Sequence, residues 1–400
     1  MTSALADLRV IDVGHVLAGP FAATLLGDLG ADVIKIEPPE GDGLRRLGPR
    51  KDGRPIWWSV AARNKRCVTL DLRVPEGQEV LVRLARVADV LIENFRPGTM
   101  ERWNVGWERL HRENPRLIML RISGYGQQSA GGGGRPMFGR PSEALSGLLH
   151  LTGFGDGPPL HAGFSLGDAS TGLMGAFGVL AALHDRERSG EGQVVDLALF
   201  ETLFRMIEWH IPMYDQLGVV TQRAGNRFPL GLMVGNVYQS ADGKWLSTSA
   251  AAENVVQRML RLVGGDALAR DPRFATPEAR ARPEHDRALD DVVREWIAAR
   301  PAPEVVDAFE QAGAVIALAH DAADIVDSLA YKDRDAIVTV DDPYLGPVRM
   351  PAAVPRLSQS PGAVRWPGPE LGAHNEEVFC GLLAMTRDEL EALRRVGAVG

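Results

Sequence analysis

The first two hundred residues of this chain alternate between short apolar runs and longer helix-like segments. The apolar runs, which are typical of buried strands, are residues 8–13, 32–37, 68–72, 89–95 and 116–123. Between them lie segments with helical periodicity, such as residues 75–88, which begin with a proline as many helices do. This alternation predicts an α/β fold whose large domain has a mostly parallel sheet with helices on both faces.

The pattern changes near residue 225. Residues 236–250 predict a β-hairpin that turns at Asp242-Gly243, and the segments after it predict amphipathic helices with charged outer faces. A strand-like segment returns at residues 336–340. We therefore expect a large domain over residues 1–224, a smaller α+β domain over 225–325, and a C-terminal part, 326–400, that returns to the large domain.

Composition narrows the classes of function. The net charge is -8 and the basic residues form no long run, so there is no electrostatic basis for nucleic-acid binding. The two cysteines, Cys67 and Cys380, form neither a metal-binding spacing nor a disulfide framework. The N-terminus lacks a secretory pattern, and the apolar stretch 173–183 is too short to span a bilayer. We expect a cytoplasmic protein with no membrane span and no bound metal.

The first predicted turn, residues 14–20, lies where a nucleotide-binding βαβ unit places its phosphate loop. A dinucleotide fold needs the spacing G-x-G-x-x-G there, because the pyrophosphate must approach bare backbone. Here the sequence is GHVLAGP, in which the glycine spacing differs and Pro20 removes a backbone donor. The turn therefore disfavours a dinucleotide-dependent dehydrogenase and leaves another nucleotide-like ligand open.

Residues 153–172 hold one carboxylate, Asp168, between Gly167 and a run of small residues that opens a long apolar segment. Small neighbours allow a ligand to approach both the carboxylate and the adjacent backbone. Aspartate is also a common residue at a helix N-cap, and the local string alone is compatible with that simpler interpretation.

A second candidate site follows the predicted strand 89–95. Asn94 and Phe95 end this strand, and ligands bind at the carboxyl ends of parallel strands. These side chains are suited to hold a purine or an amide chain, although N-F-R-P-G is also ordinary turn chemistry.

Five collinear segments of the chain resemble the class III CoA-transferase family, of the formyl-CoA transferase and carnitine CoA-transferase type. They are residues 8–42, 64–77, 88–127, 152–172 (TGFGDGPPLHAGFSLGDASTG) and 187–201 (ERSGEGQVVDLALFE), followed by a late match at 370–378. The resemblance implies a Rossmann-like large domain and a smaller domain. It also implies a homodimer in which two ring-shaped chains interlock.

The resemblance implies that Asp168 is the catalytic nucleophile. Its carboxylate would attack the donor thioester to give a mixed anhydride, and the CoA thiolate would then form an aspartyl-CoA thioester that passes CoA to an acceptor acid. A helix N-terminus would keep the carboxylate ionised. Neither ATP nor a metal is needed, and no permanently bound cofactor is expected, since CoA and acyl-CoA are substrates.

The family pattern also places the CoA-binding residues. They are His15, Val16, Ala18, Leu70, Leu72, Arg73, Asn94, Phe95 and Arg102. Arg73 and Arg102 would contact the phosphates. Pro38 stands where relatives often have arginine. Leu17 replaces the glutamine of formyl-CoA transferases, which argues against oxalate as a substrate.

The acids that are exchanged cannot be read from the sequence. Arg140 and His161 lie near Asp168 in sequence, which motivates the hypothesis that they pair with the distal carboxylate of a dicarboxylic acyl group such as succinyl. The glycine tract 131–134 is a candidate lid over the site.

Two alternatives remain. The same superfamily contains α-methylacyl-CoA racemases, whose acid/base histidine is missing from the comparable residues 137–143, although His150 or His161 offers a substitute. The second alternative is a CoA-binding protein without turnover, against which the intact Asp168 argues.

Overall fold

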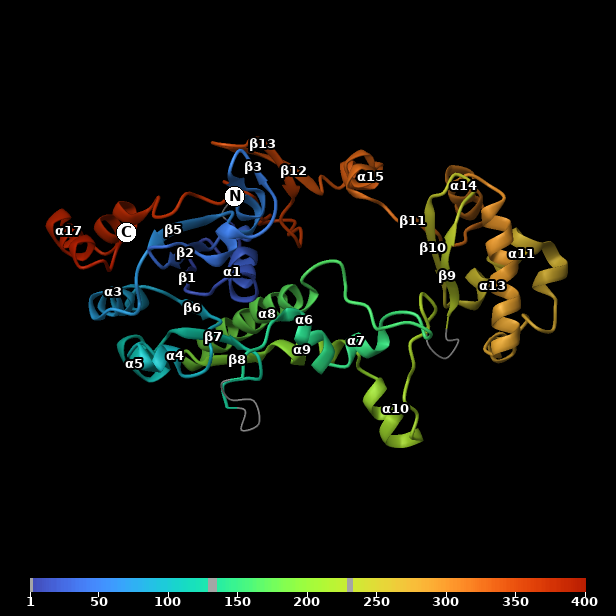
Figure 1. Cartoon of the computed structure of the whole chain (residues 1–400), viewed down its shortest axis with the longest axis horizontal. Coiled ribbons are helices and arrows are strands. Elements are labelled where there is room, and N and C mark those ends of the chain that lie inside the picture. Colours follow the sequence, from blue (N-terminus) through green and yellow to red (C-terminus); the bar gives the residue numbers. More distant parts are fainter. Residues whose placement is uncertain (1–2, 129–134, 229–232) are drawn as a thin grey trace. The chain divides into compact units, whose positions relative to one another are not determined.

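The computed structural model describes residues 3–128, 135–228 and 233–400 (Figure 1). The chain forms two compact units. The first contains residues 1–146, 162–207 and 329–400, and the second contains 147–161 and 208–328. Compared with the limits expected from the sequence, the second unit also takes in residues 147–161 and 208–224.

The first unit is built on a six-stranded sheet in which every neighbouring pair of strands is parallel. Its strands are β1 (Arg9–Asp12), β2 (Asp32–Glu37), β5 (Lys65–Thr69), β6 (Val90–Glu93), β7 (Ile118–Ser123) and β8 (Val194–Ala198). Their order is β5-β2-β1-β6-β7-β8. The chain thus starts in the middle and builds outward in both directions, so the predicted α/β fold is confirmed and β1 and β6 flank the switch point.

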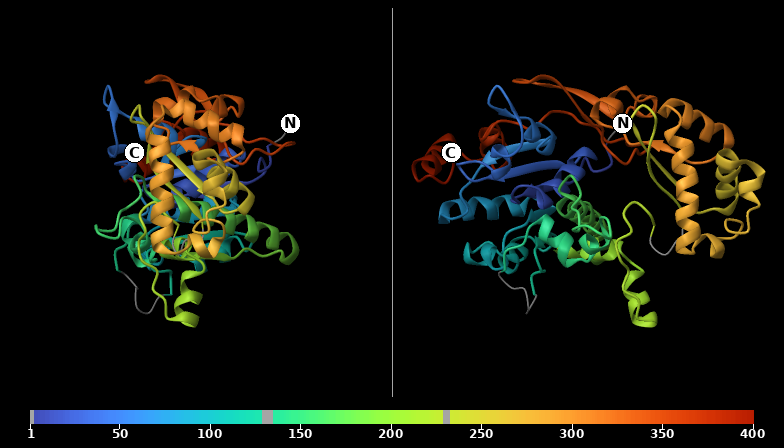
Figure 2. Two further views of the ribbon diagram at one scale, coloured as in Figure 1. Left: turned by 90° about the vertical axis from the view of Figure 1, so that its right-hand side faces the viewer. Right: turned by 45° about the vertical axis from the view of Figure 1, so that its right-hand side comes forward.

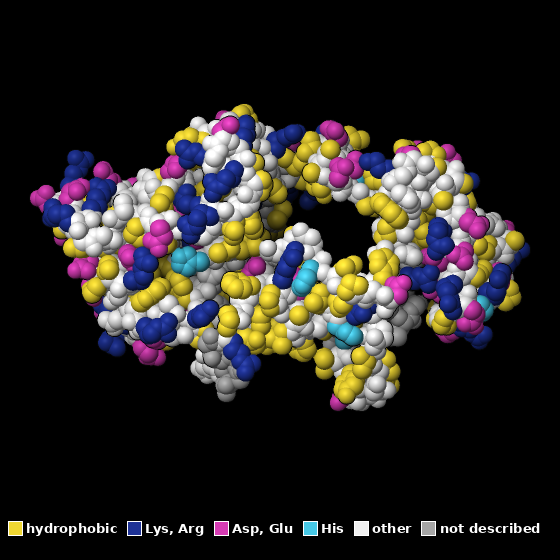
Figure 3. All heavy atoms as spheres, in the orientation of Figure 1, with side chains coloured by type: hydrophobic (Ala, Val, Ile, Leu, Met, Phe, Trp, Pro, Cys, Tyr) yellow, Lys and Arg dark blue, Asp and Glu magenta, His cyan; other side chains and the backbone are white. Residues whose placement is uncertain are grey.

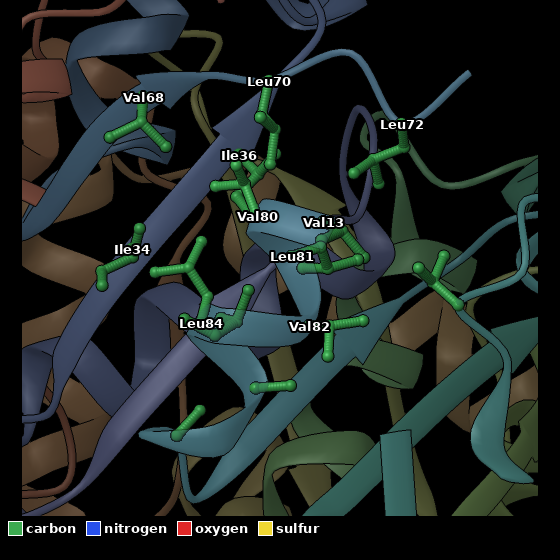
Figure 4. Packing of buried hydrophobic residues seen from close by; sticks show 14 of the residues in the cluster. Val13, Ile34, Ile36, Val68, Leu70, Leu72, Val80, Leu81, Val82 and Leu84 are labelled. Atoms are coloured by element: carbon green, nitrogen blue, oxygen red, sulfur yellow. The ribbon is translucent and has the colours of Figure 1, made fainter. Parts of the chain in front are cut away.

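Alternate residues of the strands pack into two separate cores because side chains along a strand point to opposite faces. Val10, Val33 and Val90 contribute to the core beneath α1 (Ala18–Asp28) and α8 (Leu166–Ser189). Ile11 and Ile34 face the other core, which includes residues of α3 (Pro75–Arg86) and is shown in Figure 4. Burial on both faces explains why these strands are continuous apolar runs in the sequence.

The remaining elements of the first unit connect or flank the sheet. They are η1 (Gly43–Arg46), β3 (Arg50–Lys51), β4 (Arg54–Pro55), α2 (Ile56–Ala61), α4 (Thr99–Arg102), α5 (Trp107–Glu113), α6 (Gly139–Leu145), α9 (Leu199–Met206), α16 (Leu329–Asp333), β12 (Ile337–Asp342), β13 (Gly346–Pro351), η3 (Glu377–Leu382) and α17 (Arg387–Arg395). Helix α17 begins with the capping box that Thr386 and Glu389 indicate in the sequence.

Helix α8 is 24 residues long and is the one helix among the described residues that is long and apolar enough to cross a membrane, by length and composition alone. It packs against α1 and the sheet, as the core helix of a globular protein does. Only part of it is buried: Leu173, Phe177 and Leu180 form an exposed apolar stripe at helical spacing. Residues 173–183 are thus part of a longer helix, and their own length does not decide whether α8 could span a membrane.

The C-terminal segment lies beside the N-terminal strands, as the red and blue ribbons show in Figures 1 and 2. The backbone N–H of His374 donates to the carbonyl of Cys67 (3.0 Å). The Asn375 side chain accepts from the N–H of Thr69 (2.9 Å). These contacts extend the outer edge of the sheet, beyond β5, with chain from the opposite end of the sequence.

The second unit is an α+β structure with an antiparallel sheet of order β11-β10-β9. Its elements are α7 (Leu148–Leu151), α10 (His210–Leu217), β9 (Val234–Gln239), β10 (Trp245–Ala250), α11 (Glu253–Ala269), α12 (Pro277–Arg280), α13 (Pro283–Ala298), α14 (Ala302–Ala312), β11 (Ala317–Leu318) and α15 (Ala322–Asp327). The predicted hairpin is confirmed, with Gly243 in the left-handed region (φ 78°) at its turn.

Candidate active site

The carboxyl ends of the parallel strands carry a pocket of about 250 Å³ that we call the strand-end pocket. Five of the predicted CoA-binding residues line it: His15, Leu70, Leu72, Arg73 and Phe95. Leu70 and Leu72 are almost fully buried, so they contribute apolar wall rather than polar contacts. Sheet topology thus brings together residues from the ends of β1, β5 and β6.

A second pocket, of about 220 Å³, contains Asp168 and is called the Asp168 pocket below. The predicted residues that line it are His15, Val16, Leu17, Ala18, Asn94, Phe95 and Asp168. His15 and Phe95 line both pockets, and their rings meet edge to face with centroids 5.0 Å apart. The two pockets are therefore neighbours that share one wall.

The loop after β1 is held by the strand end of β6. The N–H of His15 donates to Asn94 Oδ1 (2.6 Å), and Asn94 Nδ2 donates to the carbonyl of His15 (2.9 Å). The amide of Asn94 is thus committed to the loop backbone. Asn94 therefore shapes the site by fixing the loop, a role that its position at the end of a strand did not reveal.

Asp168 lies in the first turn of α8, two residues after Leu166, the first residue of the helix. The N-cap residue is Ser165, so the interpretation of Asp168 as an N-cap is wrong. The first turn of α8 approaches Gly139 so closely that a Cβ on Gly139 would lie 2.3 Å from Asp168 Oδ2. The carboxylate therefore occupies space that only a glycine at position 139 leaves open.

The environment of Asp168 disfavours its charge. Burial, and then the charge of Glu143, raise the pKa of Asp168 to about 6. Its position in the first turn of α8 thus does not bring this pKa down to its ordinary value. At neutral pH the carboxylate is still mostly ionised, and it is poorly solvated, which suits a nucleophile.

The two arginines predicted to contact phosphates differ in position. Arg73 lines the strand-end pocket and forms ion pairs with Asp71 (2.8 Å) and Glu40 (3.2 Å). Its hydrogen bond to Asp71 is the main reason that its pKa is raised. Arg102 lines neither pocket; it is exposed on α4 and donates to Thr99 Oγ1 (2.9 Å).

Arg140 lines a third, larger hollow of about 630 Å³, which we call the Arg140 chamber. Its wall is mainly apolar and includes Leu17, Trp57 and Phe164. Leu17 lines both this chamber and the Asp168 pocket. Among the described residues, the guanidinium of Arg140 has no ion pair or hydrogen bond.

His161 belongs to the second compact unit, whereas Arg140 belongs to the first, so their predicted pairing stays a prediction. The glycine tract 131–134 lies outside the described residues. No group of three His, Cys, Asp or Glu side chains that could hold a metal ion occurs within residues 3–128, 135–228 and 233–400.

Sequence reasoning missed several residues of the site. Arg96 and Arg135 are exposed cations that line the Asp168 pocket, and Gly139 lies against the carboxylate. Arg96 directly follows Asn94 and Phe95, so the position of these residues at the end of a parallel strand could also have indicated Arg96. Gly139 had no local signal, because its role depends on the approach of α8.

The site therefore combines a parallel α/β sheet with a pocket at its switch point and a partly buried aspartate in the neighbouring pocket. The sequence model of "CoA-transferase family III" matches residues 5–375. This chain belongs to that family.

Relatives and solved structures agree with this assignment. A succinyl-CoA–D-citramalate CoA-transferase of Chloroflexus aurantiacus is 43% identical, over 98% of this chain and 96% of the relative. A formyl-CoA:oxalate CoA-transferase of Streptomyces avermitilis is 33% identical over the full length of both chains. The crystal structure of a CAIB/BAIF family protein from Brucella suis superposes with a TM-score of 0.84 at 28% identity, covering 96% of this chain and 100% of that one.

Proposed function

We propose that this enzyme transfers CoA from succinyl-CoA to a short dicarboxylic acid, with Asp168 as the nucleophile. The observation that carries the proposal is the placement of Asp168 in a pocket that shares a wall with the strand-end pocket. CoA would lie along the strand ends, with its thioester directed to Asp168. The names of relatives that use succinyl-CoA support the choice of donor.

The proposed chemistry needs no external proton donor. An oxygen of Asp168 attacks the thioester carbon and the C–S bond breaks, which gives an acyl-aspartyl anhydride and CoA thiolate. The thiolate attacks Cγ of Asp168, the anhydride C–O bond breaks, and succinate leaves. The acceptor carboxylate then attacks the aspartyl-CoA thioester, and the same two steps run in reverse. The raised pKa of Asp168 fits a poorly solvated and hence reactive carboxylate.

Arg140 supports a dicarboxylate as the exchanged acid. The guanidinium of Arg140 is exposed at a mainly apolar chamber and has no partner among the described residues, so it is available to bind one distal carboxylate through a charge-assisted hydrogen bond. Leu17 lines the boundary between this chamber and Asp168, where it offers no hydrogen bond to oxalate.

We also propose that the chain forms a homodimer and acts in the cytoplasm. The exposed stripe of Leu173, Phe177 and Leu180 on α8 supports burial by a second copy of the chain, as in the interlocked homodimer that the family resemblance implies. Burial of α8 in such a dimer favours a cytoplasmic enzyme over a membrane span. If this is right, Phe177→Asp gives a monomer in size-exclusion chromatography with light scattering, whereas a dimeric variant contradicts it.

One observation keeps a racemase as a second candidate. His15 lines the same pocket as Asp168, and an acid/base pair of this kind would exchange the proton next to a thioester carbonyl. The stretch that carries the histidine in racemases, residues 137–143, has none, and Gly139 from it lies against Asp168.

A single assay distinguishes these functions. The enzyme is incubated in deuterated water with succinyl-CoA and a panel of dicarboxylates, or with a 2-methylacyl-CoA, and all CoA esters are identified by mass spectrometry. A new CoA ester of the added acid, without deuterium at the α-carbon, supports the transferase. Deuterium exchange in the 2-methylacyl-CoA without transfer would instead support the racemase.

A further inference from the structure

A cluster of buried charges lies directly beneath the loop that joins β1 to α1. It consists of Asp12, Lys35, Glu37, Asp42 and Lys65, and each residue is at most 1% exposed. None of these side chains belongs to the predicted CoA-binding set. Charged groups are rarely buried to this degree without a function or a complete set of partners.

One lysine of the cluster binds the backbone of the loop, and the other binds the backbone of the first turn of α1. Lys35 Nζ donates to the carbonyl of Gly14, and Lys65 Nζ donates to the carbonyl of Pro20 (2.7 Å). Both ammonium groups also face Asp12, at 3.7 Å from Lys35 and 2.9 Å from Lys65. The start of the loop and the start of α1 are thus both fixed from below.

Asp42 holds the middle of the same loop. Its carboxylate accepts from the N–H of Val16 (3.1 Å) and lies 3.2 Å from Lys35 Nζ and 3.6 Å from His15 Nδ1. Burial is the largest single influence and would raise the pKa of Asp42, but the charge of Lys35, together with hydrogen bonds from the His15 side chain and the N–H of Leu44, strongly lowers it. Asp42 is therefore ionised and tied to the loop through both charge and hydrogen bonds.

The loop needs such support because Val16 is strained. Its φ is +60°, in the left-handed region that a β-branched residue rarely adopts. A residue persists in this conformation only where its surroundings impose it, and such residues cluster at functional sites. Here the surroundings are Asp42 below the loop and Asn94 beside it.

We propose that Asp42 and Lys35 are positioning residues that hold Val16 in its strained conformation and thereby shape the wall between the strand-end pocket and the Asp168 pocket. They touch no substrate and act through the backbone of residues 14–16. This inference rests on the proposed function only in that the loop is taken to bind acyl-CoA.

Asp42→Asn is the most specific variant. It keeps an acceptor for the N–H of Val16 but places a donor or a neutral oxygen toward Lys35 and His15. We expect the KM for acyl-CoA, and the Kd for free CoA measured by calorimetry, to rise about tenfold or more, with a smaller change in kcat. An unchanged KM and Kd would overturn the proposal.

Asp89→Asn serves as the matched control. Asp89 also forms an ion pair with a buried arginine, Arg186 (3.0 Å), but it precedes β6 and so lies at the amino end of the parallel strands, away from the pockets at their carboxyl ends. We expect it to lower the melting temperature while leaving the KM and the Kd unchanged. If both variants raised the KM alike, general loosening of the fold would explain the effect and the proposal would be wrong.

Val16→Asn supplies the rescue test, and it also guards against poor folding of Asp42→Asn alone. Asparagine tolerates the left-handed region far better than valine. In the Val16→Asn background we expect Asp42→Asn to raise the KM several-fold less than in the wild type. Equal effects in both backgrounds would contradict the proposed link between Asp42 and Val16.

The proposed function is tested separately by the wild-type enzyme. If wild-type protein fails to bind CoA, the proposed function fails whatever the variants do. If it binds CoA and Asp42→Asn binds equally well, only the positioning role fails.

Discussion

Two regions of the first unit are built in different ways. One is the wall that separates the strand-end pocket from the Asp168 pocket, and the other is the Arg140 chamber. The wall is backbone fixed by buried polar side chains, including Asn94 and Asp42. The chamber is a larger, mainly apolar hollow in which Arg140 is held by no partner among the described residues. If CoA and the acid bind as proposed, the backbone of the fold forms the CoA site, whereas a replaceable side chain selects the acid.

Figure 3 shows positively and negatively charged side chains interspersed over the face it presents. On this face no broad field of one sign is present that would attract an acid substrate.

The largest expected effect comes from filling the space beside Asp168. Gly139→Ala places a Cβ 2.3 Å from Oδ2 and 2.9 Å from Cγ of Asp168, so the carboxylate must move. Because misplacement of a reacting group by about 1 Å can cost about 100-fold, we expect kcat to fall at least that much. Steady-state kinetics tests this, with Gly381→Ala as the control, since a Cβ there meets nothing within 4 Å. Comparable activity in Gly139→Ala and wild type would show that the carboxylate is not confined as described.

The chamber is tested by Arg140→Gln. Loss of a charge-assisted hydrogen bond of about 1.5 to 3 kcal/mol would raise the KM for dicarboxylate acceptors about 10- to 100-fold. Monocarboxylates of equal length should show little change, because they offer Arg140 no second carboxylate. An equal rise in the KM for dicarboxylates and monocarboxylates would contradict this role, because Arg140 would then affect the fold or the binding of CoA and not the choice of acid.

Asp168→Asn measures how much the partly buried charge of Asp168 destabilises the folded state. A raised carboxylate pKa means that the folded state binds its proton more tightly, so stability from this group is lost as pH rises from about 4 through about 6. At pH 7 the neutral amide should therefore stabilise the fold, by about 1 to 3 kcal/mol. Thermal and urea unfolding at pH 7 and pH 4 measure this, and the gain should shrink at pH 4. A destabilised variant at pH 7 would mean that the charge is compensated.

The smallest effect concerns Glu143. Only the ionised Asp168 is a nucleophile, so its rate of acylation should rise with pH to a plateau, with a midpoint near 6. Glu143→Gln removes the second cause of the raised pKa and should move this midpoint to lower pH. Single-turnover rates between pH 4.5 and pH 8 provide the measurement. A midpoint that stays in place would assign the whole shift to burial.

Much of the first unit could be predicted from local sequence because its strands are buried on both faces and therefore stand out as apolar runs. The same topology brings His15 and Phe95 together, although they are 80 positions apart. What could not be predicted depends on close approach between distant segments. The approach of Gly139 to Asp168 has no signal in the local sequence, and neither has the position of Asp42 beneath Val16. The raised pKa of Asp168 results mainly from burial, which the small residues around it in the sequence do not indicate.

The central claim is that Asp168 carries the acyl group and then CoA, and trapping tests it most directly. The enzyme is mixed with succinyl-CoA, quenched, treated with hydroxylamine, and examined by intact and peptide mass spectrometry. The account predicts an aspartyl-CoA adduct, or its hydroxamate, on the peptide that contains Asp168, absent from Asp168→Asn. Transfer of CoA to an acceptor with no adduct at Asp168, or with an adduct on another residue, would contradict it.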